Sequence, residues 1–447
     1  MAVSTGAINS AITPILVAYY KNNERKRLGE LASSLFNVIF LIFCVFGIIQ
    51  YLFAEQILKL ILPGFGQAEL IKLVSLFRIQ AFLSIITILT AILLALHYTL
   101  KNFYRTIVFS MIGQFAQIIF VWFFYKQYGV FSLVYGLVIS QSIVFVLLML
   151  PFINLYSFRI VYNAELKNAS HKIFPLIVSS AFSKSNMLVD RFFASTLSAG
   201  SITLLQYGEK IISIISGFIN KGISLVSLRK FSLEQDNEAE FQRLFYLIYK
   251  TMIFLVVPVT FIIIFFLKDA LNIILLSNNL ALQDVEKIYW VTIAFIGIFI
   301  GGSLNSTITN AFYAKGLTSL VARVAVVFQF FGIGFKVLLY FMIGFWGLPI
   351  AFSLNSILGV IALFVLYYKH IYKYNILLIL KYTLKMTLIS IVAIILSKLA
   401  GVILPELWYV RLLIELGIFL AFFGVFSKII ENDISSLFFS KIKIFRK

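Results

Sequence analysis

The segment ALHYTLKN at residues 95–102 recurs in altered form as AFYAKG at residues 311–316, and this pair decides the fold of the chain. The segment ILKLIL at residues 57–62 recurs in the same order as LNIILL at residues 271–276, again about 215 residues later. A polar loop and a long apolar run follow each of the latter two segments. The shared order and spacing predict an internal duplication of one helical unit.

Two further matches extend the duplication. Gln114 recurs as Gln329 near the start of an apolar run, and YGV at residues 128–130 aligns with WGL at residues 346–348 at the short turn that follows. In membrane proteins a duplicated bundle is typical of a transporter whose site lies between the two halves.

The composition is that of a polytopic membrane protein. Of the 447 residues, 61% are hydrophobic and 12% are charged, and the mean hydropathy is +1.01. The formal charge of +19 does not indicate nucleic acid as a partner, because the basic residues lie in short loops between apolar runs. They form a membrane topology signal instead.

Apolar runs of about 20 residues predict about thirteen membrane segments. These runs are too long and too uniformly apolar for barrel strands, so all are expected to be helices. The segments lie near residues 5–20, 31–53, 73–96, 106–125, 130–152, 173–197, 201–228, 244–267, 288–312, 317–341, 347–368, 376–399 and 407–430.

Loop charge predicts the orientation of these helices. KNNERKR at residues 21–27 and the tail at residues 441–447 are rich in Lys and Arg, and every second loop between them is also basic. By the positive-inside rule the basic loops are cytoplasmic, which places the C-terminus inside and the N-terminus outside.

The first copy of the repeat lacks a counterpart of the helix at residues 173–197 and part of the next one. We therefore expect that the chain is truncated at its N-terminus, and that the complete protein has about fourteen helices arranged as six, six and two. The alternative is that residues 1–20 form a genuine short span or a signal-like segment.

Three segments carry a resemblance to a known family. They are SNMLVDRFFASTLSAGSITLLQYGEKIISIISGFI at residues 185–219, GAINSAITPILVAYYKN at residues 6–22, and LPGFG at residues 62–66 followed by LFRIQAF at residues 76–82. Together they resemble the MviN/MurJ family of lipid II flippases, within the multidrug/oligosaccharidyl-lipid/polysaccharide exporter superfamily. Glu209-Lys210 stands where that family has an Asp-Arg pair.

The resemblance implies an all-α integral membrane protein with two pseudo-symmetric six-helix lobes, the first incomplete, and two additional C-terminal helices. The expected domains are residues 1–152, residues 153–372, and residues 373–447 with the two extra helices and a basic cytoplasmic tail. In the family such an extra pair forms a groove for the lipid tail, although plain packing or partner docking would also explain it.

The implied function is that of a flippase. It would move an undecaprenyl-diphosphate-linked saccharide, lipid II or a related peptidoglycan precursor, across the bacterial cytoplasmic membrane by alternating access. Membrane lipids and the cell-wall synthesis machinery are the implied partners. The alternatives are a flippase for O-antigen or capsule oligosaccharide-lipid, a multidrug exporter, and a membrane polysaccharide polymerase.

Ionisable side chains at membrane depth cost several kcal/mol unless they pair or line water, so they are the first candidates for a site. Asp190 and Arg191 are expected at the same depth as Glu209 and Lys210, about 15 Å below the outer surface. Cations that could grip a diphosphate are Arg78, Lys184, Arg191 and Lys210. The alternative is a set of ion pairs that merely orients the helices.

Asp190 and Glu209 are candidates for ion coupling, because desolvation or a like charge could raise a carboxyl pKa toward neutrality. A purely structural pair is the alternative. No motif of a hydrolase, nucleotide-binding or zinc-protease site occurs in the sequence. We therefore expect a transporter with no catalytic residue, no cofactor and no metal site. His97, at a cytoplasmic helix end, is expected to be solvated; the alternative is that it relays protons.

Overall fold

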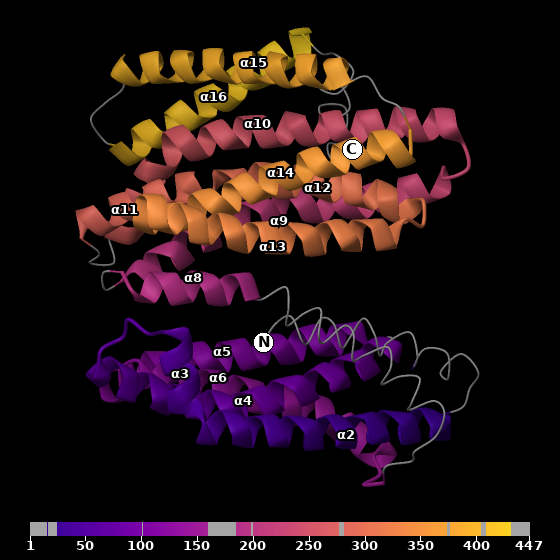
Figure 1. Cartoon of the computed structure of the whole chain (residues 1–447), viewed down its shortest axis with the longest axis vertical. Helices are drawn as coiled ribbons and strands as arrows, with labels where there is room; N and C mark the ends of the chain where they lie inside the picture. The colour runs from indigo at the N-terminus through magenta and orange to yellow at the C-terminus, as the bar shows by residue number, and fades with distance from the viewer. Residues whose placement is uncertain are drawn as a thin grey trace. The chain divides into compact units, whose positions relative to one another are not determined.

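The computed structural model describes Leu16 and residues 25–100, 102–159, 185–197, 200–276, 281–372, 376–403 and 408–430, and these residues are almost entirely helical (Figure 1). Ten helical runs among them are long and apolar enough to cross a membrane. One of these runs, Thr318–His370, contains two of the predicted segments. The predicted segment at residues 5–20 lies outside the described residues except for Leu16, as do residues 173–184 of the segment predicted at residues 173–197. The predicted all-α membrane class is confirmed.

The chain divides into two compact units, an N-terminal unit of Met1–Thr196 and a C-terminal unit of Leu197–Lys447. The domain boundaries predicted after residues 152 and 372, and the count of six helices per lobe, stay predictions. The described helices of the N-terminal unit are α2 (Arg25–Leu52), α3 (Ala54–Ile61), α4 (Gln67–Thr99), α5 (Phe103–Tyr128), α6 (Phe131–Met149), the 3-10 helix η1 (Leu150–Leu155) and α8 (Ser185–Ser195).

In the N-terminal unit α4 packs against both α2 and α6, and α5 packs against α6. Buried apolar side chains of α2, α4 and α6 form the core of this unit. By contrast, α5 exposes large apolar side chains such as Trp122 and Phe123, at 82% and 72% of their surface. An apolar face of this kind is stable toward lipid, which solvates it as well as a protein core would.

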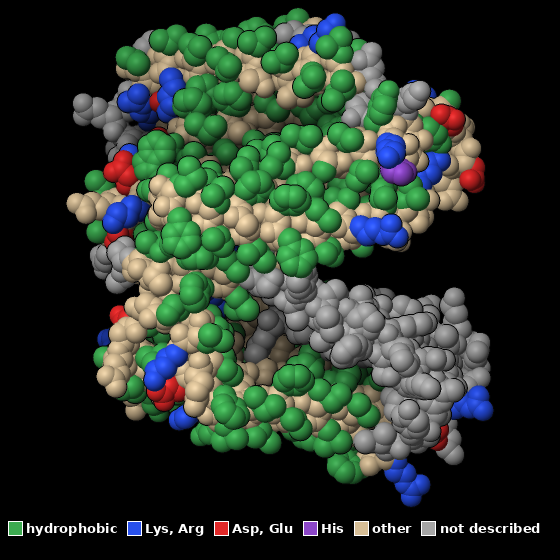
Figure 2. Space-filling model, viewed as in Figure 1, with side chains coloured by type: hydrophobic (Ala, Val, Ile, Leu, Met, Phe, Trp, Pro, Cys, Tyr) green, Lys and Arg blue, Asp and Glu red, His purple; other side chains and the backbone are tan. Residues whose placement is uncertain are grey.

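The described helices of the C-terminal unit are α9 (Ser201–Leu233), α10 (Glu238–Leu276), α11 (Leu282–Ala294), α12 (Ile296–Ala314), α13 (Thr318–Ile343), the 3-10 helix η2 (Gly344–Trp346), α14 (Gly347–His370), α15 (Ile376–Ile403) and α16 (Trp408–Ile430). Here α12 is central and packs against α9, α10 and α14, whereas α15 and α16 pair with each other and lie against α10. Hydrophobic side chains cover much of the visible helix surface of this unit, and most visible charged side chains lie near the helix ends (Figure 2).

The helix bounds support the duplication. Helix α4 and the run α11–α12 are each 33 residues long, and α5 and α13 are each 26 residues long. In both cases the second member begins about 215 residues after the first. Within its own unit, α5 packs on α6 as α13 packs on α14, and α4 packs on α6 as α12 packs on α14.

One detail of the predicted alignment was wrong. Residues 128–130 do not correspond to residues 346–348; the turn after α5 corresponds to the turn after α13 instead. Gly129 caps α5 with φ 54° and ψ −131°, and Gly344 caps α13 with φ 61° and ψ −132°. Both conformations suit glycine, because a Cβ is strained at positive φ. The sequence match around Gly347 came from a second glycine, which begins α14.

The segment predicted as one helix at residues 288–312 is broken at Phe295 into α11 and α12. The Ser353 hydroxyl of α14 donates a hydrogen bond to the Ala294 carbonyl oxygen at 2.5 Å, and the Gly297 amide donates to the Ser353 hydroxyl at 3.2 Å. This side chain thus occupies two backbone groups at the break, and insertion of a side chain into the helical ladder is a known cause of kinks.

The expectation that His97 is solvated was wrong. His97 is only 2% exposed, and its Nε2 lies 3.1 Å from the Leu148 carbonyl oxygen of α6. The histidine therefore belongs to the packing of α4 against α6. Whether it relays protons stays a prediction.

Candidate functional site

A polar pocket of about 630 Å³ lies between α3 and the first half of α4. We call it the α3–α4 pocket. It is lined by Glu55, Lys59, Leu62, Pro63, Phe65, Gln67, Leu70, Ile71, Val74, Ser75 and Arg78. One of the predicted cationic residues, Arg78, is thus placed in a cavity. In the predicted topology this pocket lies toward the outer face of the membrane, because α2 begins at the basic cytoplasmic loop.

The Arg78 side chain is oriented by contacts with Tyr51 of α2. Its Nε donates to the Tyr51 carbonyl oxygen at 3.3 Å, and its guanidinium carbon lies 5.1 Å from the centre of the Tyr51 ring. An arginine side chain has five N–H donors, so most of its donor capacity remains for a ligand in the pocket. The exposed guanidinium is therefore both oriented and chemically available.

Sequence reasoning missed a second cation in this pocket. Lys59 Nζ lies 2.6 Å from Glu55 Oε1, one turn away on α3. The hydrogen bond from Lys59 lowers the pKa of the Glu55 carboxyl, and the charge of Arg78 lowers it further. The three groups carry a net charge of about +1, which favours an anion. The i, i+4 spacing of Glu55 and Lys59 was the available signal, but residues 57–62 were used only to align the repeat.

The loop between α3 and α4 packs on the end of α8. A Cβ on Gly64 would lie 1.9 Å from the Ser195 carbonyl oxygen, and the Gly64 amide donates to the Ser195 hydroxyl at 3.4 Å. This contact joins two of the segments that carry the family resemblance, residues 62–66 and residues 185–219. It explains why glycine stands at residue 64.

Asp190 and Arg191 lie on α8 in the N-terminal unit, and both are half-buried. Lys184 lies outside the described residues. Glu209 and Lys210 belong to α9 of the C-terminal unit, so the expectation that they lie at the same depth as Asp190 and Arg191 stays a prediction.

Helix α9 presents Glu209 and Lys210 outward. A Cβ on Gly208 would lie 2.6 Å from the Val291 side chain of α11, so the Gly208 face of α9 is pressed against α11. At 3.6 residues per turn, Lys210 lies roughly 200° around the helix from Gly208. Both Glu209 and Lys210 are accordingly exposed on the C-terminal unit.

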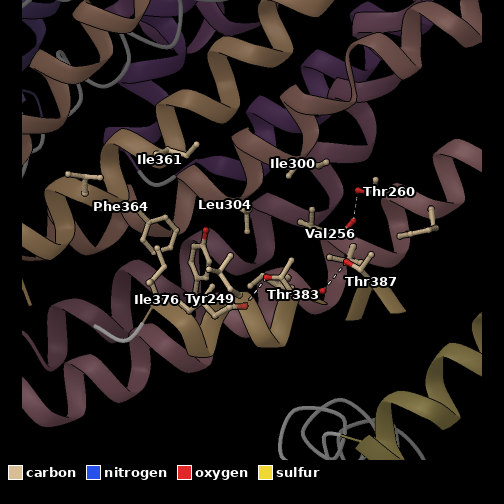
Figure 3. A pocket seen from close by; sticks show the side chains of 16 residues that line it. Tyr249, Val256, Thr260, Ile300, Leu304, Ile361, Phe364, Ile376, Thr383 and Thr387 are labelled. Atoms are coloured by element: carbon tan, nitrogen blue, oxygen red, sulfur yellow. Dashed lines mark hydrogen bonds between the residues drawn. The ribbon is translucent and has the colours of Figure 1, made fainter. Parts of the chain in front are cut away.

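An apolar groove of about 430 Å³ lies in the C-terminal unit among α10, α12, α14 and α15 (Figure 3). Its threonines do not make it polar. The hydroxyls of Thr260, Thr383 and Thr387 each donate to a carbonyl of their own helix at 2.8–2.9 Å. The groove is suited to hydrocarbon, and it is lined by Tyr249, Ile253, Val256, Val257, Thr260, Phe261, Ile300, Leu304, Ile361, Phe364, Val365, Ile376, Ile379, Leu380, Thr383 and Thr387.

Two other charged side chains are buried in the described helices. Lys336 of α13 is only 1% exposed, and its Nζ lies 4.0 Å from the centre of the Phe352 ring of α14. Glu415 of α16 is 2% exposed and pairs with Lys398 and Arg411. The i, i+4 spacing of Arg411 and Glu415 was a usable signal. Among the described residues, no cluster of three or more His, Cys, Asp or Glu suits a metal ion.

Comparison with known proteins identifies the family of this chain. The family model described as "Lipid II flippase MurJ" matches residues 2–418. A probable lipid II flippase MurJ of Buchnera aphidicola subsp. Schizaphis graminum is 22% identical over 383 residues, which cover 81% of this chain and 72% of that protein.

Solved structures share the fold. A structure of lipid II flippase MurJ in an inward closed conformation matches with a TM-score of 0.82 and 23% identity, covering 96% of this chain and 90% of that one. An inward-facing multidrug resistance MATE family transporter matches with a TM-score of 0.68 and 10% identity, covering 81% and 86%. The family match spans most of the chain and both compact units, and the protein therefore belongs to the MurJ family of lipid II flippases, which are multi-pass membrane transporters and not enzymes.

Proposed function

We propose that this protein moves lipid II from the inner to the outer leaflet of the bacterial cytoplasmic membrane by alternating access. The observation that carries the proposal is the family match over residues 2–418. The cationic pocket and the apolar groove support it, because the substrate combines a diphosphate with a long hydrocarbon tail.

The cations take the diphosphate. Arg78 and Lys59 line the α3–α4 pocket with a net positive charge, and Lys210 and Arg191 add cations on α9 and α8. Arg and Lys form charge-assisted hydrogen bonds to phosphate oxygens, each worth about 1.5–3 kcal/mol. Lys184 belongs to the same proposed set.

The apolar groove takes the isoprenoid tail. Its threonine hydroxyls are satisfied within their helices, so burial of a hydrocarbon chain leaves none of them without a partner. If the tail stays in the groove while the head group crosses the membrane, the hydrocarbon chain does not have to pass the polar residues that bind the diphosphate.

Asp190 and Glu209 couple transport to a cation or proton. One carboxylate lies in each compact unit, so release of its ion would change the charge near one half of the transporter. The three predicted domains, residues 1–152, 153–372 and 373–447, act in this scheme as two moving lobes and a C-terminal helix pair, of which α15 lines one side of the groove for the tail. Cell-wall synthesis enzymes are the proposed partners, since they supply and consume lipid II.

The test is transport in vesicles of defined composition. Purified protein is reconstituted with fluorescent lipid II, and the fraction that becomes accessible to an outside quencher is followed over time. A second set of vesicles carries undecaprenyl diphosphate bearing an O-antigen sugar. Faster movement of lipid II than in protein-free vesicles, with little movement of the second lipid, supports the proposal. Preference for the O-antigen lipid, or no acceleration of either, contradicts it.

A further inference from the structure

The α15–α16 pair buries one carboxylate between two cations. Glu415 Oε2 lies 2.6 Å from Lys398 Nζ, and Glu415 Oε1 lies 2.8 Å from Arg411 Nε. The Glu415 side chain is 3% exposed, whereas the side chains of Lys398 and Arg411 are 39% and 43% exposed. The carboxylate is thus inside the helix pair, and both cations reach its surface.

Helix α15 makes close contacts with Glu415 of α16. A Cβ on Gly401 would lie 1.9 Å from Glu415 Oε1, so a glycine is needed at the point where the carboxylate meets α15. The Ser397 hydroxyl also donates to the Glu415 backbone carbonyl at 2.6 Å. These contacts fix the carboxylate, and through it the positions of Lys398 and Arg411.

The cluster has charge and donors left over. Two cations and one carboxylate leave a net charge of about +1. Lys398 has three N–H donors and Arg411 has five, and each places one on Glu415. A ligand at this surface would therefore be an anion with several acceptor oxygens, and phosphate fits that description.

The cluster lies near the outer ends of its helices in the predicted topology. The 28-residue α15 begins after a basic loop assigned to the cytoplasm, and Lys398 lies about five residues before its other end. At 1.5 Å per residue this is roughly 8 Å from the end of a helix about 42 Å long. A hydrocarbon core about 30 Å thick places that depth close to its boundary, where lipid phosphates begin.

We propose that Lys398 and Arg411, held by Glu415, bind the phosphate of a membrane lipid in the outer leaflet. Lys398 Nζ also lies 4.8 Å from the centre of the Phe266 ring on α10. Helices α10 and α15 both line the apolar groove further along their length, so the acyl or prenyl chain of a lipid held here lies along the same two helices. This inference rests on the cluster itself and does not require the proposed transport.

The test compares lipid retention by purified full-length variants. Lys398→Gln with Arg411→Gln removes both cations, and Lys268→Gln is the matched control. Lys268 belongs to an ion pair at the same end of the C-terminal unit, 2.8 Å from Glu286, with side chains 47% and 48% exposed and no surplus charge. Because the double variant leaves Glu415 buried without its partners, a triple variant that adds Glu415→Gln preserves the packing without that charge.

Three probes separate the possible sources of the phosphate: phosphatidylglycerol in phosphatidylcholine nanodiscs, undecaprenyl diphosphate in the same nanodiscs, and inorganic phosphate alone. Bound lipid per protein is counted by mass spectrometry on variants that pass a thermal unfolding check. We expect both charge-removing variants to bind at least one of the two lipids about tenfold more weakly, with Lys268→Gln unchanged. Unchanged binding of both lipids, an equal loss in Lys268→Gln, or binding of inorganic phosphate alone overturns the proposal.

Discussion

Gly129 and Gly344 hold the same backbone conformation at the ends of two matched helices, with φ of 54° at the first and 61° at the second. Neither position has an atom within 4 Å of where a Cβ would stand, so the need for glycine comes from the backbone and not from crowding. The duplication has thus preserved a conformational requirement where the surrounding side chains differ.

Replacement of Gly129 or Gly344 by alanine is expected to lower the free energy of unfolding by about 1–2 kcal/mol each, because a Cβ is strained at positive φ. Gly334→Ala is the control. It lies inside α13 with open space around its Cβ position, so alanine there should be neutral or slightly stabilising. Thermal unfolding in one detergent would measure all three. Equal melting temperatures for Gly344→Ala and Gly334→Ala would contradict the claim that the positive φ at residue 344 requires glycine.

Gly64→Ala is expected to loosen the loop between α3 and α4 from α8. Its Cβ would lie 1.9 Å from the Ser195 carbonyl oxygen, and overpacking of this kind costs about 1–3 kcal/mol. Gly66→Ala, in the same loop with nothing within 4 Å, is the matched control. Transport and melting temperature should fall for Gly64→Ala and stay near wild type for Gly66→Ala. Equal transport rates and melting temperatures for the two variants would mean that the contact between residue 64 and Ser195 does not contribute to stability.

Arg78→Ala and Lys210→Ala are expected to abolish transport without loss of membrane insertion, since in the proposed function each residue supplies a phosphate contact of about 1.5–3 kcal/mol. Lys72→Ala is the control for charge alone, because Lys72 is an exposed lysine of α4 that does not line the α3–α4 pocket. The vesicle assay for lipid II supplies the measurement. Wild-type rates for Arg78→Ala and Lys210→Ala would assign both residues a structural role or none.

Ser353→Ala should destabilise the break between α11 and α12 by about 1–2 kcal/mol, because the Ala294 carbonyl and the Gly297 amide both lose a hydrogen bond. Ser306→Ala is the control, since its hydroxyl donates to Ser303 within α12. Spin labels on α11 and α12 would report the angle between the two helices, and thermal unfolding would report stability. An unchanged angle and melting temperature would show that the break does not depend on Ser353.

Transport is expected to run on an ion gradient or the membrane potential, because the sequence contains no Gly-x-x-x-x-Gly-Lys motif for nucleotide phosphates. The potential supplies about 2.3 kcal/mol per charge per 100 mV, and an inside-negative potential favours outward movement of a diphosphate. An ionophore should therefore leave lipid II on the cytoplasmic leaflet of cells with intact ATP. Full outward transport under the ionophore, lost only on ATP depletion, would refute this mechanism.

The sequence by itself determined the helical membrane class and the internal repeat. Long apolar runs must satisfy their backbone hydrogen bonds locally in lipid, so the runs at residues 106–125 and 347–368 could only become helices such as α5 and α14. The sequence also singled out Arg78, because a charge within an apolar run is rare enough to be informative by itself.

Tertiary structure decided where helices break and which charges meet. The run at residues 288–312 contains no proline, and at its break the Ala294 carbonyl and the Gly297 amide bond to Ser353 from another helix. The companion of Arg78 in its pocket is Lys59 from a separate short helix, and the burial of Glu415 depends on the glycine at residue 401 of α15. A run of residues sets its own backbone hydrogen bonds through local composition, whereas these contacts join atoms distant along the chain, and their energies exist only once the helices have packed.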